Sequence, residues 1–341
     1  MSECRCFHVA AGRGLRPVGS FEDAVAALGG GGYIWVDISD PSRAELDAVA
    51  ARLGIHPLAV EDCFDSNQVP KVEDYPGHTF ILCNRFAYHD RELLVEEVDL
   101  FLGKNFLVSV GSRAGGGRPA SERIEAIAAR SLATVERGPD FLLHVILDVT
   151  VDGMVDAIEP LEDDIEAAET GVLRDVPGFK LESLVQLRRA LLALRKTLFH
   201  EREILVKICR RDSPFVSEEA IYHYRDVYDH LAKFFEFTEM NRDILANLTE
   251  MHLSLINNRM ARVANRTNRS VRRLTLITTI FMPLSLLAGI GGMSEWSMMT
   301  GPANWRFAYP AFALAMVLIG SASYVVLRRL ERREGNHRDR T

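Results

Sequence analysis

Cysteine is scarce in this sequence, and a signal for secretion is missing. The 341 residues include five cysteines, too few and too scattered for the disulfide framework of a small secreted protein. The first thirty residues lack a basic segment followed by an apolar one, so we expect no cleaved leader and an N-terminus in the cytosol. Both absences favour a reducing compartment for most of the chain.

The mean composition excludes further classes of protein. With 48% hydrophobic and 26% charged residues, a net charge of −7 and a mean hydropathy of +0.00, the chain is not intrinsically disordered, collagen-like or a many-helix membrane protein. No nucleotide-binding motif is present. We expect a protein that is not an enzyme, holds no cofactor and binds no nucleic acid. These averages, however, conceal a strong segregation along the chain.

Lysine is absent from the last part of the sequence, and charge of either sign is absent from two long runs within it. The segment Arg259–Thr341 carries thirteen arginines and four acids, a net charge of +9, which leaves −16 on the residues before it. The uncharged runs are Leu274–Met293, with 20 residues, and Phe307–Leu327, with 21. Each can cross about 30 Å of hydrocarbon as a helix. We therefore predict two transmembrane helices rather than the core helices of a soluble protein.

Arginines flank the two runs on their far sides, whereas the connecting segment 294–306 holds one basic residue. Because positive charge stays on the cytosolic side of a membrane, we expect both termini in the cytosol and two passes through the cytoplasmic (inner) membrane. The predicted domains are a cytosolic α/β domain (1–138), a helical stalk (139–273), a first transmembrane helix (274–293), an outer loop (294–306), a second transmembrane helix (307–327) and a basic tail (328–341).

The fold class predicted for the whole chain is an α+β cytosolic domain followed by long helices and two C-terminal transmembrane helices. A strand is expected at Tyr33–Ser39, followed by a helix at Ala44–Leu53 with a cap at Asp40-Pro41-Ser42. Three apolar runs predict an antiparallel meander: His78–Phe86, Leu94–Leu102 and Asn105–Val110. From Pro139 onward the pattern is helical.

Proline is absent between Pro214 and Pro283, which predicts one helix from Glu218 to Gly292, 75 residues and about 110 Å long. Within it a stripe at three- and four-residue spacing is expected to pack against other helices: Phe234, Phe237, Met240, Ile244, Leu248, Met251 and Leu255. A helix of this length needs neighbours. With two spans per chain, the economical arrangement is a symmetric ring of copies.

One face of the first predicted span is small or polar at nearly every position. Its residues are Asn268, Val271, Thr275, Thr278, Met282, Ser285, Gly289 and Gly292, whereas the opposite face carries Ile277, Phe281, Leu284 and Leu287. In a ring, the first face would line an axial pore in which hydroxyls and carbonyls meet a hydrated cation. The alternative is that small residues at this spacing let helices pack closely.

Two smaller features suggest ion binding. Glu295 is the only acid between the spans, and a ring would repeat it at the outer mouth, where it would concentrate cations; as an isolated surface residue it would do nothing special. The motif Cys4-x-Cys6-x-His8 has the residue types of a zinc site but lacks a second pair of ligands. Neither feature alone identifies a function.

The run Thr275–Met293 (TLITTIFMPLSLLAGIGGM), a second span and a short basic tail resemble the two-helix divalent cation transporters of the CorA type, including the ZntB and CmaX groups. The segments 68–75 (QVPKVEDY) and 224–230 (YRDVYDH) are similar to that family as well. The resemblance covers almost the entire chain. It implies a homopentamer with a cytosolic funnel, a stalk helix that continues into the pore-lining helix, and the second span outside it.

The family closes its inner helix with Gly-Met-Asn, and this chain reads Gly292-Met293-Ser294. The resemblance implies that these residues, with Glu295, form the selectivity entrance, where the shorter Ser294 hydroxyl replaces an amide and changes the hydration of the ion. It also implies a regulatory metal site between cytosolic domains, for which Glu236 and Glu250 are candidates. The alternative for each is a solvated acid of the stalk.

The expected function is transport of a divalent cation, with Mg²⁺ as the first choice and Zn²⁺, Co²⁺ or Ni²⁺ as alternatives, in either direction and with or without proton coupling. The transported ion is the only metal that this function requires. The expected partners are four further copies of the chain and the lipid bilayer. A different class of function is a membrane-anchored helical scaffold, but an anchor has no need of a polar and glycine-rich face on its first span.

Overall fold

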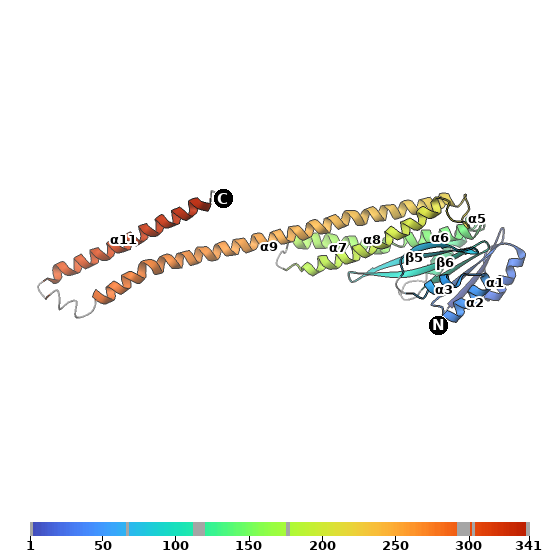
Figure 1. The fold of residues 1–341 in the computed structure, drawn as a ribbon, viewed down its shortest axis with the longest axis horizontal. Coiled ribbons are helices and arrows are strands. Elements are labelled where there is room, and N and C mark those ends of the chain that lie inside the picture. Colours follow the sequence, from blue (N-terminus) through green and yellow to red (C-terminus); the bar gives the residue numbers. More distant parts are fainter. Residues whose placement is uncertain are drawn as a thin grey trace. The chain divides into compact units, whose positions relative to one another are not determined.

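The computed structural model describes residues 3–65, 68–111, 120–174, 178–291, 301 and 304–338. The chain divides into two units, Met1–Leu253 and Ser254–Thr341. Figure 1 shows the elements of both units along the sequence. The predicted fold class is confirmed, because an N-terminal α/β domain is followed by long helices and two C-terminal apolar helices.

The first unit is built on a seven-stranded sheet with the order β2-β1-β3-β7-β6-β5-β4. Its strands are β1 (Glu3–Ala10), β2 (Gly14–Val18), β3 (Tyr33–Ser39), β4 (Lys71–Asp74), β5 (His78–His89), β6 (Glu92–Gly103) and β7 (Phe106–Gly111). The pair β3–β7 is parallel and the other pairs are antiparallel. The strand predicted at 33–39 and the meander β5-β6-β7 are thus confirmed.

Short helices cover one face of this sheet (Figure 1). They are α1 (Phe21–Ala27), the 3-10 turn η1 (Leu28–Gly30), α2 (Arg43–Leu53) and α3 (Pro57–Asp62). Alternation along β3 directs Ile34, Val36 and Ile38 into the core beneath them. The helix predicted near 44–53 begins as expected, because Ser42 and Glu45 form a capping box.

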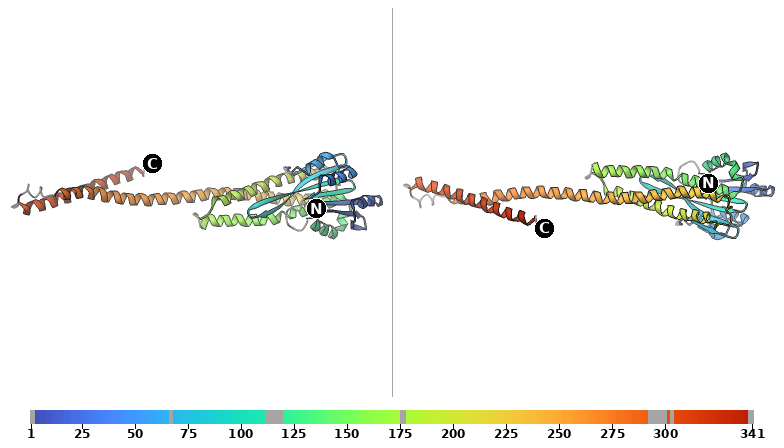
Figure 2. Two further views of the ribbon diagram at one scale, coloured as in Figure 1. Left: turned by 90° about the horizontal axis from the view of Figure 1, so that it is seen from below. Right: turned by 90° about the horizontal axis from the view of Figure 1, so that it is seen from above.

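Helices cover the other face as well: α4 (Ala120–Arg130), α5 (Leu132–Val135), α6 (Pro139–Asp152), α7 (Val155–Arg174) and α8 (Leu181–Cys209). Helix α6 contacts β3, β5, β6 and β7, whereas α7 and α8 contact the β5–β6 hairpin and each other. The residues of β3 that alternate with Ile34, Val36 and Ile38 point to this second face. Among them, the Tyr33 hydroxyl donates a hydrogen bond to the Val135 carbonyl at 2.8 Å. Figure 2 shows α7 and α8 beside the first part of α9 (Ile221–Gly291).

Helix α9 has 71 residues, and its start corrects the prediction. Residues 218–220 form a turn rather than the first helical residues, so the helix begins at Ile221, three residues after the predicted Glu218. The Ala220 N–H donates to the Ser217 carbonyl, three residues back, at 3.1 Å, so this first turn is tighter than an α-helix, and the Ser217 hydroxyl donates to Asp140 Oδ2 of α6 at 2.6 Å. The predicted end, Gly292, lies outside the described residues.

The face of α9 that packs in the first unit is also different from the predicted stripe. Met240 of that stripe is 58% exposed, whereas Thr238 and Asn241 are buried together with Leu245 and Leu248. The polar side chains are tolerated because they bond to their own helix: Thr238 Oγ1 donates to the Phe235 carbonyl at 2.7 Å and Asn241 Nδ2 to the Phe237 carbonyl at 3.0 Å. The prediction of an apolar stripe was therefore wrong in part.

The second unit contains the rest of α9 and α11 (Trp305–Arg338). Two helices hold a window long and apolar enough to cross a membrane, one within Ile221–Ile290 and one at Arg306–Val326. None of the residues in either window is buried inside the structure. Both candidate spans thus leave their apolar side chains to be covered by something other than this chain.

Candidate pore-lining face and metal cluster

The small and polar stripe of α9 lies on an exposed face. Each of its described members is exposed, from Asn268 and Val271 through Thr275 and Thr278 to Met282, Ser285 and Gly289. Met282 is 76% exposed and nothing lies within 4 Å of a Cβ added at Gly289. Within the described part of the second unit, this face therefore has no packing partner, as a face that lines a passage between copies requires.

The opposite face of the same helix packs against α11. The half-buried residues of this part of α9 recur at helical spacing: Leu276, Ile280, Pro283, Leu284 and Leu287. An apolar groove of about 480 Å³ is lined by Ile280 and Leu284 from α9 and by Gly320 and Tyr324, among others, from α11. A Cβ at Gly320 would lie 3.5 Å from Leu284 Cδ1, so the glycine permits a close approach of the two helices. The second helix thus occupies one face of α9 and leaves the stripe open.

The threonine hydroxyls of the stripe bond to their own helix. Thr275 Oγ1 donates to the Val271 carbonyl and Thr278 Oγ1 to the Leu274 carbonyl, each at 3.0 Å. Because the single proton of each hydroxyl is engaged, the oxygen offers only lone pairs to other groups. Such an oxygen can accept a hydrogen bond from the water shell of a cation, and it is satisfied within the helix when no ion is present.

Five of the six arginines on the preceding turns of α9 lie away from the stripe, and the sixth, Arg272, lies beside Asn268 one turn further on. At 3.6 residues per turn, Arg259, Arg262, Arg266, Arg269 and Arg273 fall on the side of the helix that faces away from Asn268 and Thr275. All five are exposed. The face that would meet a cation is therefore nearly free of positive charge along these turns, while the other side carries most of it.

The predicted selectivity entrance cannot be placed in this arrangement. Gly292, Met293, Ser294 and Glu295 lie outside the described residues. Gly292 is also the last predicted member of the stripe, so the stripe is described from Asn268 to Gly289. The residues of the entrance remain a prediction from the sequence.

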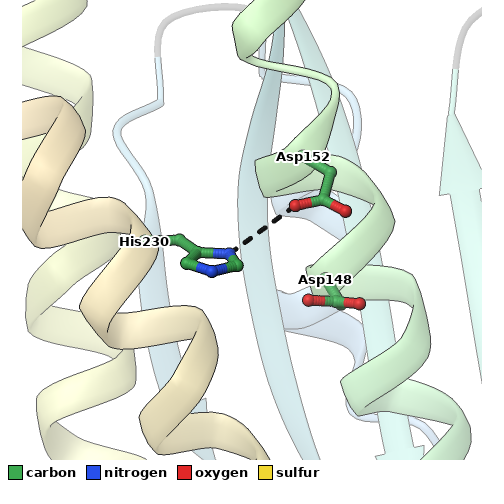
Figure 3. A group of neighbouring side chains, drawn as sticks. All are labelled: Asp148, Asp152 and His230. Carbon is green, nitrogen blue, oxygen red and sulfur yellow. Dashed lines mark ion pairs between the residues drawn. The ribbon is translucent and has the colours of Figure 1, made fainter.

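The first unit gathers three possible metal ligands that the sequence reasoning did not select (Figure 3). Asp148 and Asp152 lie one turn apart on α6 and face His230 of α9, and the ligand atoms of the three all lie within 4.8 Å of one another. Asp152 Oδ1 is 3.6 Å from His230 Nδ1. Burial raises the pKa of Asp148, with the charge of Asp152 as the next cause. A divalent cation would remove that repulsion.

The candidates chosen from the sequence lie elsewhere. Glu236 and Glu250 are exposed on α9, and neither belongs to a group of three possible ligands among the described residues. The signal for the observed cluster was present in two pieces. Asp148 and Asp152 have the i, i+4 spacing of one helix face, and His230 closes the segment YRDVYDH, but only the fold brings the two pieces together.

Comparison with known proteins identifies the family. The profile of the CorA-like Mg²⁺ transporter protein family matches residues 30–329. The cobalt/magnesium transport protein CorA of Thermotoga maritima is 33% identical over 299 residues, which cover 86% of this chain and 82% of that protein. This chain belongs to the CorA family. It is therefore a divalent cation transporter of the channel-like kind and not an enzyme.

Solved structures of the CorA family share the fold. The CorA magnesium transporter of Methanocaldococcus jannaschii matches with a TM-score of 0.68 at 23% identity, covering 96% of this chain and 97% of that one. The full-length CmaX protein matches with a TM-score of 0.67 at 18% identity and the same coverage. The order of α/β domain, long helices and two apolar helices is therefore the architecture of the family, and two membrane-spanning helices are expected of this member.

Proposed function

We propose that this CorA-family chain forms a homopentamer that passes a divalent cation through an axial pore. The proposed lining is the stripe of Asn268, Val271, Thr275, Thr278, Met282, Ser285, Gly289 and Gly292. One observation carries the proposal: the described part of this stripe is exposed on the face of α9 opposite the one that packs on α11. A membrane anchor with no pore would have no reason to leave hydroxyls and a glycine on an uncovered face.

The electrostatics of α9 support a cation path along the same face. Hydroxyl oxygens with engaged protons favour positive ligands, and most of the arginines point to the other side. In a ring of copies, the stripe would face the axis and the arginine side would face outward. Met282, with no charge and a flexible thioether, would narrow the path without binding the ion strongly.

Mg²⁺ is the proposed first substrate, and Zn²⁺, Co²⁺ and Ni²⁺ are the alternatives. Oxygen ligands that meet the ion through its water shell suit Mg²⁺, which loses water reluctantly. The relatives are named as cobalt/magnesium and magnesium transporters, and one as the divalent cation transporter CmaX. Since no nucleotide-binding motif is present, the flux follows the electrochemical gradient of the ion, with or without a coupled proton.

The proposed membrane is the cytoplasmic membrane, with both termini in the cytosol. Arginines precede the first span and follow the second, and the segment between them holds one. The domains keep the proposed bounds: 1–138, 139–273, 274–293, 294–306, 307–327 and 328–341. This topology places both the sheet and the metal cluster in the cytosol. There they are exposed to the cytosolic concentration of the ion, which transport changes.

We also propose that Asp148, Asp152 and His230 bind the cation as a regulatory site. The three come from two different helices of the first unit, so an ion would link α6 to α9. Because α9 continues into the candidate span, a change in this link acts on the same helix that carries the stripe. Binding at this cluster would stabilise one arrangement of α9 by mass action.

Flux measurements on liposomes that contain the purified protein test the transport proposal. We expect uptake of Mg²⁺ down its gradient, with Zn²⁺, Co²⁺ and Ni²⁺ compared under the same conditions, and a pentamer by cross-linking of the membrane-embedded protein. A sealed liposome with no flux for any of the four ions would contradict transport and favour the scaffold. A flux that is larger for Zn²⁺ than for Mg²⁺ would replace the first substrate by the alternative.

A further inference from the structure

Two cysteine thiols meet on the first strand of the sheet. Cys4 and Cys6 are two residues apart on β1, so their side chains leave the same face of the strand. Their Sγ atoms are 3.7 Å apart. Two of the other three cysteines bond to backbone carbonyls instead, since Cys63 Sγ donates to the Ala59 carbonyl and Cys83 Sγ to the Val98 carbonyl. Cys4 and Cys6 are thus a thiol pair fixed by the strand itself.

The separation of the two sulfurs suits a shared metal ion. Zinc–thiolate bonds are about 2.3 Å long, and two of them at a tetrahedral angle hold their sulfurs about 3.8 Å apart. A disulfide instead requires sulfurs at about 2.0 Å and Cα atoms usually about 4.4–6.8 Å apart, most often about 5.5–6 Å. Two residues along an extended strand span about 6.6 Å. The strand therefore holds the two sulfurs at the separation found in a metal chelate, while the Cα atoms lie near the long end of the range for a disulfide.

The pair is accessible from one side and lies in a negative field. Cys4 is exposed, whereas Cys6 is 4% exposed and belongs to the core between the sheet and α2. The hydrogen bond between the two thiols lowers the pKa of Cys4, although burial and the carboxylates of Asp37 and Glu45 act in the opposite direction. The same hydrogen bond and burial raise the pKa of Cys6, so its proton is lost only when the ion binds. Those two carboxylates repel a thiolate and attract a cation, so an ion that joins the pair is favoured by both.

His8 does not complete a Cys-x-Cys-x-His site. Its Nε2 lies 2.9 Å from the Gly31 carbonyl oxygen, and it stands two further residues along the strand. The protein ligands are then two sulfurs, and water fills the remaining positions. A site of this kind exchanges its ion readily, in contrast to a closed structural zinc site with four protein ligands.

We propose that Cys4 and Cys6 form a clip for one thiophilic d¹⁰ cation, Zn²⁺ in the first place, separate from the pore and from the Asp148–Asp152–His230 cluster. Binding is an acid–base exchange: each S–H loses its proton to water as its sulfur bonds the ion, and nothing is oxidised. Thiolates reject Mg²⁺, which takes oxygen ligands. The clip would therefore respond to a soft cation in the presence of the hard one that the pore is proposed to carry.

Cadmium titration of the full-length protein in detergent tests the clip. Cd²⁺ is the probe because its bonds to thiolate sulfur absorb in the ultraviolet, whereas binding at carboxylate and imidazole ligands does not produce this band. The protein is reduced, freed of reductant under nitrogen and titrated in excess Mg²⁺. We expect one equivalent of Cd²⁺ per chain, and Cys4→Ser to weaken binding at least about tenfold. Cys209→Ser is the matched control and should titrate like the wild type.

Three outcomes would overturn the clip. One is a Cys4→Ser protein whose affinity and band are within twofold of the wild type, with the same result for Cys6→Ala. Another is displacement of Cd²⁺ from the wild type by Mg²⁺. The third is an air-exposed, unreduced protein in which alkylation after denaturation labels three cysteines instead of all five, because the pair would then have closed to a disulfide. Cys4 is exposed, so its serine variant tests the site without disturbing the core.

Discussion

The two units of this transporter treat ionisable and apolar groups in opposite ways. The first buries carboxyl groups inside a complete core, with Asp99 3% and Glu201 4% exposed. In the second, the apolar runs contain no charged residue, and large side chains such as Leu274 and Leu318 are 63% and 61% exposed. The first unit thus buries a core within a single chain, whereas the apolar side chains of the second are left to be covered from outside the chain.

The comparison extends to the two faces of α9 within the second unit. One face is half-buried on α11, and the other is exposed and polar. If the exposed stripe merely faced lipid, apolar side chains would serve it better than Thr275, Thr278 and Ser285.

The largest effect is expected from bulk placed in the stripe. Thr275→Trp should reduce Mg²⁺ flux into liposomes at least about a hundredfold, because an indole repeated in every copy would fill a passage built for a hydrated ion. Ile277→Trp is the matched control. Ile277 lies two residues away on the far side of the helix, is 54% exposed, and should retain flux within about threefold.

Cross-linking should show the same oligomer for both variants, so that the difference in flux is caused by the substituted side chain and not by failed assembly. Equal flux in both would place the cation path away from the stripe. Loss of flux in Ile277→Trp with normal flux in Thr275→Trp would assign the lining to the opposite face and contradict the proposal.

The parts of the fold that could be predicted from sequence are those specified locally. The apolar run YIWVDIS indicated the strand at 33–39, and the predicted cap at Asp40-Pro41-Ser42 indicated the start of α2. The packing face of α9 was mispredicted, because Thr238 and Asn241 satisfy their polar groups on their own helix and can then be buried like apolar residues. A hydrophobic pattern cannot show that compensation.

The candidate site divides in the same way. The stripe was selected from three- and four-residue spacing on one helix; its described members are exposed, and their role as a pore lining stays a prediction. The cluster of Asp148, Asp152 and His230 depends on contact between α6 and α9, far apart in the chain. The acids selected from sequence, Glu236 and Glu250, had only their position on a helix in their favour. Long-range pairing was the missing information.

Truncation of a leucine should distinguish the two units by stability. Leu102→Ala in β6 removes a side chain that is 0% exposed and should cost about 2–5 kcal/mol. Leu318→Ala in α11, exposed by 61%, should change the stability of the detergent-solubilised protein by less than about 1 kcal/mol. Thermal unfolding followed by circular dichroism measures both, and an equal loss for the two variants would contradict the division.

A smaller effect is expected at the metal cluster. Mg²⁺ or Co²⁺ at a hundred times its dissociation constant stabilises a protein by about 2.7 kcal/mol when it binds only the folded state. This stabilisation is measured as an increase in the melting temperature when the ion is added. Asp152→Asn should remove most of the increase, since it deletes a ligand that lies close to His230. Glu236→Gln and Glu250→Gln, on exposed positions of α9, should retain it. The reverse pattern would restore the candidates chosen from sequence.

The smallest expected effect concerns a carboxyl group that the first unit buries, that of Glu201. Burial raises the pKa of Glu201 to about 8, although the Asn84 backbone N–H, which donates to its Oε1 at 2.9 Å, acts to lower it. The folded state therefore holds a proton that the unfolded state releases above about pH 4.5, so the contribution of this group is complete below that pH and is lost as pH rises toward 8. The loss is about 1.4 kcal/mol per pH unit.

In Glu201→Gln, which cannot ionise, the free energy of unfolding measured by urea between pH 5.5 and 7.5 should fall less steeply by that amount. The exposed variant Glu236→Gln should keep the wild-type slope, and an unchanged slope in Glu201→Gln would mean that the carboxyl is already ionised in the folded protein.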